Sequence, residues 1–370
     1  MNGFEEYKIR SRGNVPFNYL FDRIVSILVK SEYHKIGYPK KALIIRNDHV
    51  GDMILSTNVF SEFKNAFPKC KITVMTSHHN RSLIEKDKHV DDIIPLGLFW
   101  RRGLKGFQEY LKVLKRIKKE NFDVGITLRN SKLNSLFLLY IPKIKTRVGY
   151  YNINGGKPFL THPILYSKIV HGLKEDMELL EKAFNIKIKK VMPELSYDRE
   201  DKKKTESFLK ENGISKYIMV VPGTTVENKR WPIPKVAEFI RRFHEKYPSY
   251  KILISGPERD REIIDFLCKG NESFCVQEIG KLNLREFGIA LKKAKEIIAN
   301  NGAGTDIGWV AGGNLVYLAG PVSLKIDLPL KKTKILRHEI RPDYGDVSLI
   351  TVEEVMKAVD EFITTDKNRK

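Results

Sequence analysis

The stretch RNDHVGDMILST, residues 46–57, places two acids and a histidine directly behind a short apolar run. Asp52 follows Gly51 at the point where the strand-like residues 41–46 give way to a helix-like segment, and we expect Gly51 to let the backbone turn tightly there. A carboxylate at such a junction either caps the helix or acts as a general base that removes a proton from a bound hydroxyl. Asp48 is the competing acid. Local features alone leave both roles of Asp52 open.

Three loops of the C-terminal half carry glycine and small polar residues after apolar runs: VPGTTVENKRWP (221–232), SGPERD (255–260) and NNGAGTDIGWVAGG (300–313). The hydroxyls of Thr224 and Thr225 and the ammonium group of Lys229 are suited to neutralising a diphosphate leaving group. Gly302 and Gly304 let backbone amides approach an anion, and the following helix start adds a partial positive charge. These loops therefore predict a phosphate site.

Other anion and metal chemistries lack their signatures. The glycines at 302, 304 and 308 also fit a nicotinamide dinucleotide loop, but they come late in the chain and no acid ends a following strand at the expected distance. There is no DxD motif for Mg²⁺ and no GxxxxGK[ST] phosphate loop. The three cysteines and the His78-His79 pair form neither a disulfide framework nor a metal-binding spacing. We therefore expect no protein-bound metal or cofactor.

The charge of the chain is concentrated in its first half. Residues 1–195 contain 35 Lys and Arg against 19 Asp and Glu, a net charge of +16 out of +21 for the whole chain. This indicates an anionic partner such as a membrane or a phosphorylated glycolipid, or simply lysine-rich solvated faces. Nucleic acid is disfavoured because no RNP, KH or double-stranded-RNA-binding pattern is present. No run of 18 apolar residues and no secretory signal is found, so a membrane span is not expected.

Strand-like and helix-like segments alternate along the chain, which predicts an α/β fold with parallel sheets covered by helices. Apolar residues at helical spacing predict a helix over 53–67, and the rhythm restarts after a charged helix over 198–213 that stops at a glycine. In doubly wound folds, ligands gather at the carboxyl ends of the strands. We expect two Rossmann-like halves and these domains: an N-terminal extension 1–40, an acceptor domain 41–195, a nucleotide-sugar domain 196–350, and a C-terminal helix and tail 351–370.

Residues 14–30, NVPFNYLFDRIVSILVK, form an apolar segment outside both halves. Its large apolar side chains can share one face of a helix. That helix either packs on the first domain or lies on a membrane surface with its basic flanks near the headgroups.

Five blocks in the same order, between residues 41 and 330, resemble glycosyltransferase family 9, the heptosyltransferases of bacterial lipopolysaccharide synthesis. They are RNDHVGDMILST, FDVGITLRNSKLNSLFLLYIPKIKTRVGY, FLTHPI with HGLKEDMELLEKAFNI, VPGTTVENKRWPIPKVAEFIRRF and ISGPERDREI. The resemblance implies a GT-B fold, with two Rossmann-like domains facing each other across a cleft. It also implies inverting, metal-independent transfer of a sugar from a nucleotide donor such as ADP-heptose.

The resemblance also assigns roles to residues. It places the catalytic base at Asp52. Donor and phosphate contacts fall on Thr224, Thr225, Lys229, Glu258, Asn301, Gly302, Ala303, Gly304, Thr305 and Asp306. Acceptor contacts fall on Asp48, Gly51, Arg129, Asn130 and Lys132, in the basic half of the chain.

The last loop departs from the family pattern Asn-Asp-Ser/Thr-Gly-Pro-x-His. Asn301 stands where the family has Asp, Gly302 where it has Ser or Thr, and Asp306 where it has His. These changes alter the donor contacts and therefore bear on which sugar nucleotide is used.

The expected enzyme is a glycosyltransferase that acts peripherally on the cytoplasmic face of the bacterial inner membrane. Its partners would be a nucleotide sugar, an anionic lipid-linked glycan acceptor and the anionic membrane surface. Two alternatives are a sugar-nucleotide epimerase on a similar two-domain fold and a catalytically silent glycan-binding relative. The epimerase would need acids or histidines at the sugar ring, for which Asp48, His49 and Asp52 are the evident candidates.

Overall fold

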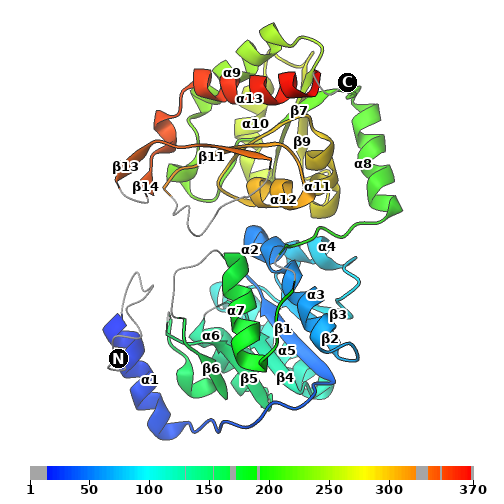
Figure 1. Ribbon diagram of the computed structural model, residues 1–370. Helices are drawn as coiled ribbons and strands as arrows, with labels where there is room; N and C mark the ends of the chain where they lie inside the picture. Colours follow the sequence, from blue (N-terminus) through cyan, green and yellow to red (C-terminus); the bar gives the residue numbers. More distant parts are fainter. Residues whose placement is uncertain are drawn as a thin grey trace. The chain divides into compact units, whose positions relative to one another are not determined.

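The computed structural model describes residues 15–129, 131–152, 154–166, 172–189, 192–321, 332–341 and 344–367. The chain divides into two compact units, Met1–Pro193 and Glu194–Lys370. Each unit contains a six-stranded parallel sheet with helices on both faces (Figure 1). The α/β class and the two Rossmann-like domains predicted from the alternation of segments are confirmed.

The sheet of the first unit has the strand order β3-β2-β1-β4-β5-β6. Its strands are β1 (Lys41–Arg46), β2 (Lys71–Thr76), β3 (Asp92–Pro95), β4 (Val124–Thr127), β5 (Thr146–Tyr150) and β6 (His162–Ile164). From β1 the chain passes to β2 and β3 on one side of β1. It then returns to β4, β5 and β6 on the other side of β1. The carboxyl ends of β1 and β4 therefore form the switch point at which such sheets bind ligands.

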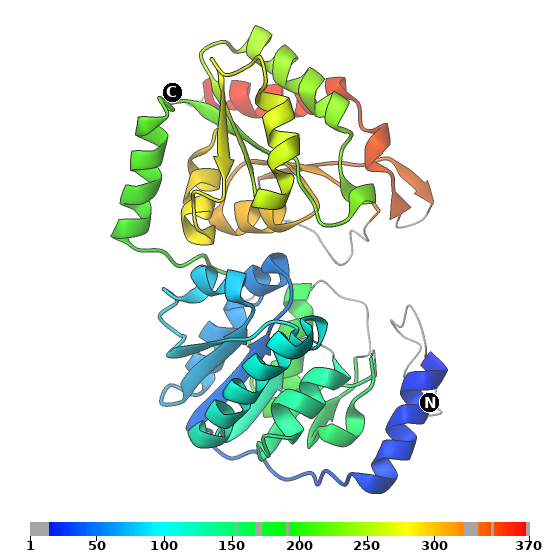
Figure 2. The ribbon, with the colours of Figure 1, turned by 180° about the vertical axis from the view of Figure 1, so that it is seen from behind.

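Helices cover both faces of this sheet. They are α1 (Val15–Leu28), α2 (Val50–Leu55), α3 (Thr57–Ala66), α4 (Arg81–Ile84), α5 (Gly103–Glu120), α6 (Lys132–Asn134), the π-helical turn η4 (Ser135–Tyr140) and α7 (Gly172–Phe184). Helix α7 lies in front of the sheet in Figure 1 and α5 lies in front in the reverse view of Figure 2, so the two cover opposite faces. Leu43 and Ile45 of β1 are fully buried in the cluster that contains Tyr110 and Ile117 of α5.

The predicted single helix over 53–67 is wrong, because the segment forms two helices that meet at Ser56. The Ser56 side chain is fully buried, accepts a hydrogen bond from Nε of Arg46 at 2.8 Å and donates one to Asp176 at 2.6 Å. A buried polar anchor at this position explains why the helix axis breaks here although the apolar spacing continues.

The sheet of the second unit has the strand order β12-β11-β10-β7-β8-β9. Its strands are β7 (Tyr217–Val221), β8 (Lys251–Gly256), β9 (Cys275–Ile279), β10 (Ile297–Asn300), β11 (Leu315–Leu318) and β12 (Thr333–Leu336), and a small hairpin follows, β13 (Glu339–Arg341) with β14 (Tyr344–Gly345). Its helices are α8 (Arg199–Glu211), α9 (Ile233–Lys246), α10 (Arg261–Cys268), α11 (Leu284–Lys293), α12 (Ala303–Ala311) and α13 (Val352–Lys367). Helices α9, α10 and α13 share one hydrophobic core with the sheet, whereas α8 and α12 both contact α11.

Helix α8 shows how local sequence signals set its limits. Asp198 and Asp201 form a capping box at its start. Gly213 lies just past its end with a left-handed φ of +63°, which confirms the predicted glycine stop. Among the described residues, no helix has the length and apolar character needed to cross a bilayer.

Candidate functional site

The carboxylate of Asp52 lies in the first turn of α2, at the carboxyl end of β1. His49 is the N-cap residue of this helix, so Asp52 is its third helical residue. Asp52 is half-buried, and its carboxylate takes part in no hydrogen bond or ion pair with any described residue. A cap residue would accept a backbone hydrogen bond. The local structure therefore does not use Asp52 as a cap and leaves its oxygens available.

Gly51 does not form the tight turn that its position before Asp52 indicates. It is the second residue of α2 and is not among the glycines with positive φ. The change of direction after β1 is instead made by His49 in an extended conformation, with φ −85° and ψ 158°. The expectation that Gly51 turns the backbone is therefore wrong.

A buried arginine fixes the end of β1. Arg46 donates from Nη2 to Oδ2 of Asp176 at 2.6 Å, and both side chains are almost completely buried. Burial alone would lower the pKa of Arg46, but the carboxylates of Asp176 and Asp48 outweigh it and raise the pKa. The guanidinium therefore stays charged and joins β1 to α7 of the same unit.

Asp48 belongs to this same ionic cluster. Its Oδ2 lies 3.3 Å from Nη1 of Arg129 and 3.8 Å from Nη1 of Arg46, and its side chain is only 8% exposed. Its other oxygen, Oδ1, is buried and has no partner among the described residues. Asp48 is thus held beside two guanidinium groups, whereas Asp52 is not.

The surroundings of Asp52 raise the pKa of its carboxyl to about 6. Burial is the main cause, and the negative charge of Asp48 is the second. The positive charges of Arg46 and His49 act in the opposite direction but do not compensate. A carboxylate with a pKa near neutrality is a stronger base than an ordinary aspartate and is still ionised above pH 6.

The other acceptor residues expected from the sequence are placed differently from one another. Arg129 follows β4 and joins the Asp48 cluster. Lys132 donates to Oδ1 of Asn18 in α1 at 3.0 Å, and its ammonium group lies over the rings of Phe17 and Phe21 at 4.7 and 4.8 Å. It is thus engaged with α1. Asn130 lies outside the described residues.

In the second unit, three of the expected donor residues come together where β7 and β10 end side by side. Thr224 donates from its hydroxyl to the carbonyl oxygen of Asn301 at 3.2 Å. Lys229 donates to Oδ1 of Asn301 at 2.8 Å, and Nδ2 of Asn301 donates to the hydroxyl of Tyr317 at 2.7 Å. The side chain in the family's aspartate position is therefore a neutral amide, fixed on both sides.

Helix α12 begins directly after this contact. Gly302 is its N-cap, without a side chain to occupy the first amides, and a Cβ there would meet no atom of the described residues within 4 Å. Its φ of 163° is extended, so no backbone strain requires glycine. The amides at the start of an α-helix lack intrahelical partners and bind anions. With Ala303 as its first residue, the helix presents these amides on its open side.

Other residues of the loop have structural roles. A Cβ on Gly304 would lie 2.8 Å from Cγ1 of Val221, so this glycine allows α12 to approach β7 closely. Thr305 is buried and donates to the carbonyl oxygen of Asn300 at 2.7 Å. Asp306 is half-buried in the first turn of α12.

Thr225 and Glu258 are exposed on the neighbouring loops. Glu258 accepts hydrogen bonds from Arg261 at 2.5 and 2.8 Å, which lowers the pKa of its carboxyl. No bond links either side chain to the contact between Thr224, Lys229 and Asn301. The structure therefore unites only part of the expected donor set.

Three supporting residues were not predicted from the sequence as part of the site: Ser56, Asp176 and Tyr317. Asp176 lies 130 residues along the chain from Arg46, whereas Ser56 lies 10 residues from Arg46 and Tyr317 lies 16 residues from Asn301. Only their burial in the folded unit reveals them. Within the ranges that the structure describes, no group of three or more His, Cys, Asp or Glu side chains is arranged to hold a metal ion.

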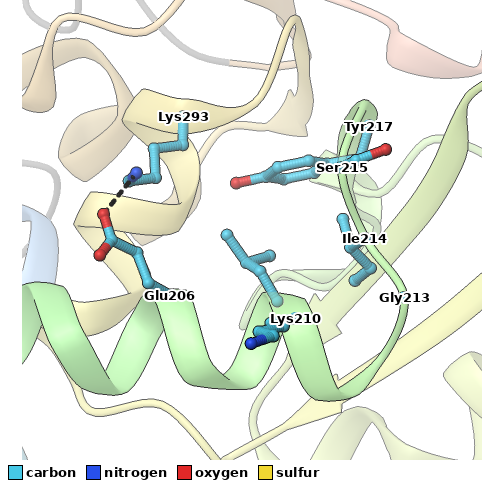
Figure 3. Close-up of a pocket in the computed structure, with 8 residues that line it drawn as sticks. Glu206, Lys210, Gly213, Ile214, Ser215, Tyr217 and Lys293 are labelled. Carbon is cyan, nitrogen blue, oxygen red and sulfur yellow. Dashed lines mark hydrogen bonds and ion pairs between the residues drawn. The ribbon is translucent and has the colours of Figure 1, made fainter.

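A surface pocket of the second unit is separate from these residues (Figure 3). It is lined by Glu206, Leu209, Lys210, Gly213, Ile214, Ser215, Tyr217 and Lys293, and an ion pair of 2.8 Å joins Glu206 to Lys293. Tyr217 is the first residue of β7, whereas Thr224 follows the end of that strand. The pocket therefore lies at the amino end of β7, whereas the start of α12 lies near the carboxyl end of that strand.

Comparison with known proteins shows a consistent set of relatives. Residues 110–322 match glycosyltransferase family 9 (heptosyltransferase). The chain is 26% identical to lipooligosaccharide heptosyltransferase 2 of Haemophilus influenzae over 317 residues, which is 80% of this chain and 88% of that protein. The structure of E. coli ADP-heptose lps heptosyltransferase II aligns with a TM-score of 0.75 at 20% identity, covering 88% of this chain and 99% of that one. A family 9 glycosyl transferase of Veillonella parvula aligns with a TM-score of 0.76 at 19% identity, covering 90% and 100%.

Proposed function

The chain belongs to glycosyltransferase family 9 and is a glycosyltransferase, and from this premise we propose that it moves a heptose-like sugar from a nucleoside diphosphate donor to a lipopolysaccharide-type acceptor. The observation that carries the proposal is the half-buried carboxylate of Asp52 at the switch point of the first sheet, which has no hydrogen-bond or ion-pair partner among the described residues and whose pKa is raised to about 6. The names of its relatives support ADP-heptose as the donor and a lipooligosaccharide or lipopolysaccharide as the acceptor.

In the proposed reaction, Asp52 is the general base. Its carboxylate removes the proton of an acceptor hydroxyl while that oxygen attacks the anomeric carbon of the donor sugar. The new glycosidic bond forms on the face opposite the breaking bond between the anomeric carbon and the phosphate oxygen, so the configuration inverts. The proton ends on Asp52 and the nucleoside diphosphate leaves with the bonding electrons.

The charges of Asp48 and Arg46 influence the protonation state of Asp52. Arg46 is held by Asp176, so its charge stays in place when the reaction changes the charge of Asp52. Asp48 raises the pKa of Asp52 and thereby increases its strength as a base. Arg129, paired with Asp48, is the side chain that we propose to contact an anionic group of the acceptor. Gly51, at the start of α2, is the other described residue that we propose to contact the acceptor.

The leaving diphosphate would be stabilised by protein groups rather than by a metal. The ammonium group of Lys229 is fixed by Asn301, which follows the last residue of β10 and precedes Gly302, the N-cap of α12. The hydroxyls of Thr224 and Thr225 and the first amides of α12 add hydrogen-bond donors. Preorganised donors of this kind stabilise charge that develops as the bond to phosphate breaks.

The departures in the last loop concern the donor. Asn301 binds Lys229 through a neutral oxygen, where a carboxylate would neutralise the ammonium group. Lys229 therefore keeps more of its positive charge for the phosphates. Asp306, in place of a histidine, adds an acid to the first turn of α12. We propose that these two changes select a donor sugar different from that of the relatives or a different contact to the same sugar.

We place the reaction at the cytoplasmic face of the bacterial inner membrane, with the enzyme bound peripherally. The net charge of +16 over residues 1–195 supports this placement, because an anionic lipid-linked acceptor and an anionic leaflet both attract a basic unit.

The test is sugar transfer from ADP-heptose to a lipopolysaccharide acceptor truncated before its heptoses, followed by mass spectrometry. We expect Asp52→Ala to lower kcat by at least about 100-fold while leaving the affinity for ADP unchanged. The matched control Asp265→Ala removes an exposed acid of α10 and should leave kcat unchanged. Transfer by Asp52→Ala at the wild-type rate would disprove the base assignment. An isomerised free sugar nucleotide as the product would favour an epimerase instead.

A further inference from the structure

Helix α1 is oriented with its apolar side outward. Its buried side chains are polar, Asn18 and Asp22, with 7% and 3% exposed. Its outward side chains are large and apolar, with between 52% and 83% exposed: Phe17, Leu20, Ile24, Ile27 and Leu28. Helices on the surface of globular proteins normally show the reverse arrangement. The exposed apolar face therefore needs an explanation other than packing against its own unit.

Polar contacts hold α1 in this orientation. The carboxylate of Asp22 accepts hydrogen bonds from the backbone amides of Gly156 at 2.8 Å and Lys157 at 3.1 Å. Asn18 accepts one from Lys132 at 3.0 Å. Gly155 has a left-handed φ of +76°, and a Cβ there would lie 3.2 Å from Oδ1 of Asp22. The loop is thus shaped to receive the carboxylate, and Val15 and Tyr19 pack against the core of the unit while the five outward residues stay exposed.

The exposed residues form one continuous stripe. With 100° of rotation per residue, the five positions fall within an arc of about 100°, roughly opposite Asn18 and Asp22. Arg23 is exposed and lies near one border of this stripe, and the exposed Lys30 follows two residues after the last residue of α1. Asp22 is the only acid in α1, and it is buried. An apolar stripe bordered by cations and free of exposed acids is the pattern of a helix that lies in a bilayer interface.

The net charge of the first unit and the area of the exposed stripe both favour a membrane over a second copy of the chain as the partner of α1. The unit that contains α1 carries most of the net charge, +16 over residues 1–195, and this count includes the exposed residues Lys112, Lys115, Lys118 and Lys119 of α5. Two such units would repel each other, whereas an anionic leaflet attracts them. A 14-residue helix is about 21 Å long and about 10 Å wide, so one face covers on the order of 200 Å². A stable dimer buries about 800 Å² per partner.

We infer that α1 docks on the surface of an anionic lipid bilayer. The helix lies along the interface, Leu20, Ile24 and Ile27 insert between the acyl chains, and Arg23 and Lys30 bind lipid phosphates. This inference deepens the proposed function and rests on it only for the biological purpose of the docking. Docking would hold the acceptor unit at the surface that carries a lipid-linked acceptor. Apolar insertion and basic attraction together give reversible binding.

The test is flotation of the full chain with vesicles of phosphatidylethanolamine and phosphatidylglycerol in a 3:1 ratio. The double variant Ile24→Glu/Ile27→Glu should bind at least about 100-fold more weakly, because each substitution removes an inserted side chain and adds a negative charge. The matched control Phe266→Glu/Leu349→Glu changes two exposed apolar residues of the second unit and should bind within about twofold of wild type. Vesicles of phosphatidylcholine alone should bind the wild-type chain at least tenfold more weakly.

Several results would overturn the inference. Equal binding of wild type and the α1 variant would show that another surface docks. Loss of binding in the Phe266→Glu/Leu349→Glu control to the same degree would show a nonspecific effect. Sedimentation that finds an α1-dependent dimer without vesicle binding would identify a second copy as the occupant. Circular dichroism of each variant excludes unfolding, since all four residues are exposed. Docking without sugar transfer would contradict the proposed function alone, and transfer without α1-dependent docking would contradict this inference alone.

Discussion

The raised pKa of Asp52 implies that this residue destabilises the folded protein. An ordinary aspartate has a pKa of 3.8, and the folded structure raises that of Asp52 to about 6. Well below pH 3.8 the carboxyl is protonated in both the folded and the unfolded chain, and between pH 3.8 and 6 only the unfolded chain ionises, so the cost grows over this range. As the pH rises through 6, the folded chain must carry a charge that its surroundings disfavour. The cost is therefore fully present above pH 6 and absent in acid.

The substitution Asp52→Asn removes this cost. A shift of about 2 pKa units corresponds to about 3 kcal/mol, which is the upper limit of the gain at pH 7.5. For a unit of this size, 1 kcal/mol moves the Tm by about 2–4 °C, so we expect the transition of the first unit to rise by up to about 6–12 °C. The same variant should lose nearly all transfer activity. Stability gained at the expense of function is typical of active-site residues.

Differential scanning calorimetry at pH 7.5 and pH 4.0 measures this effect. The gain should shrink to about a fifth at pH 4.0, because the folded carboxyl is then protonated and the unfolded one is only partly ionised. Asp265→Asn, an exposed acid of α10, is the matched control and should change the Tm by less than about 1 °C at either pH. A gain of equal size at both pH values, or a lower Tm at pH 7.5, would show that Asp52 is not an electrostatically strained carboxylate.

Three further predictions concern the neighbours of the reacting groups. Asp48→Asn removes the second cause of the raised pKa, so the acid limb of the pH profile of kcat/KM should move down by up to about 1 unit. Lys229→Ala should weaken ADP binding by about tenfold or more in calorimetric titration, whereas Lys216→Ala, an exposed lysine before β7, should not. Arg46→Ala leaves Asp176 buried without its cation and should lower the free energy of unfolding by about 3–5 kcal/mol in urea titration. An acid limb that stays in place, an unchanged ADP affinity or an unchanged urea midpoint would contradict the respective assignment.

The family and the fold class were both predictable from the sequence, and both are confirmed. The reason is that the signals are local: an apolar run, a glycine or small polar loop, and a helix follow one another within about 30 residues. The helix stop at Gly213 is local in the same sense. The strands β5 and β6 escaped the analysis because they lie inside a block identified only by its resemblance, without a separate helix signal between them.

What could not be predicted depends on contacts between distant residues. Nothing near Ser56 in the sequence shows that Arg46 and Asp176 meet its hydroxyl, and this contact breaks the predicted helix. Gly51 was misread for a related reason. A glycine before an acid is typical of a turn, but the extended backbone of His49 already makes that turn. The local conformational propensity of a segment is overridden where tertiary contacts fix its backbone.

The orientation of helix α1 also could not be predicted from the sequence. The spacing of apolar residues identifies a stripe along the helix, but it does not say which side of the helix faces the protein. Burying the apolar side is the usual outcome, and the alternatives of packing and membrane contact could not be separated from sequence. The backbone amides of Gly156 and Lys157 decide the orientation, because they bind Asp22 and turn the polar side inward. Since Lys132 holds Asn18 of the same helix, α1 is joined directly to the loop that follows β4 and carries Arg129. The position of α1 on a membrane would therefore constrain the segment that carries Arg129, on the acceptor side of the proposed site.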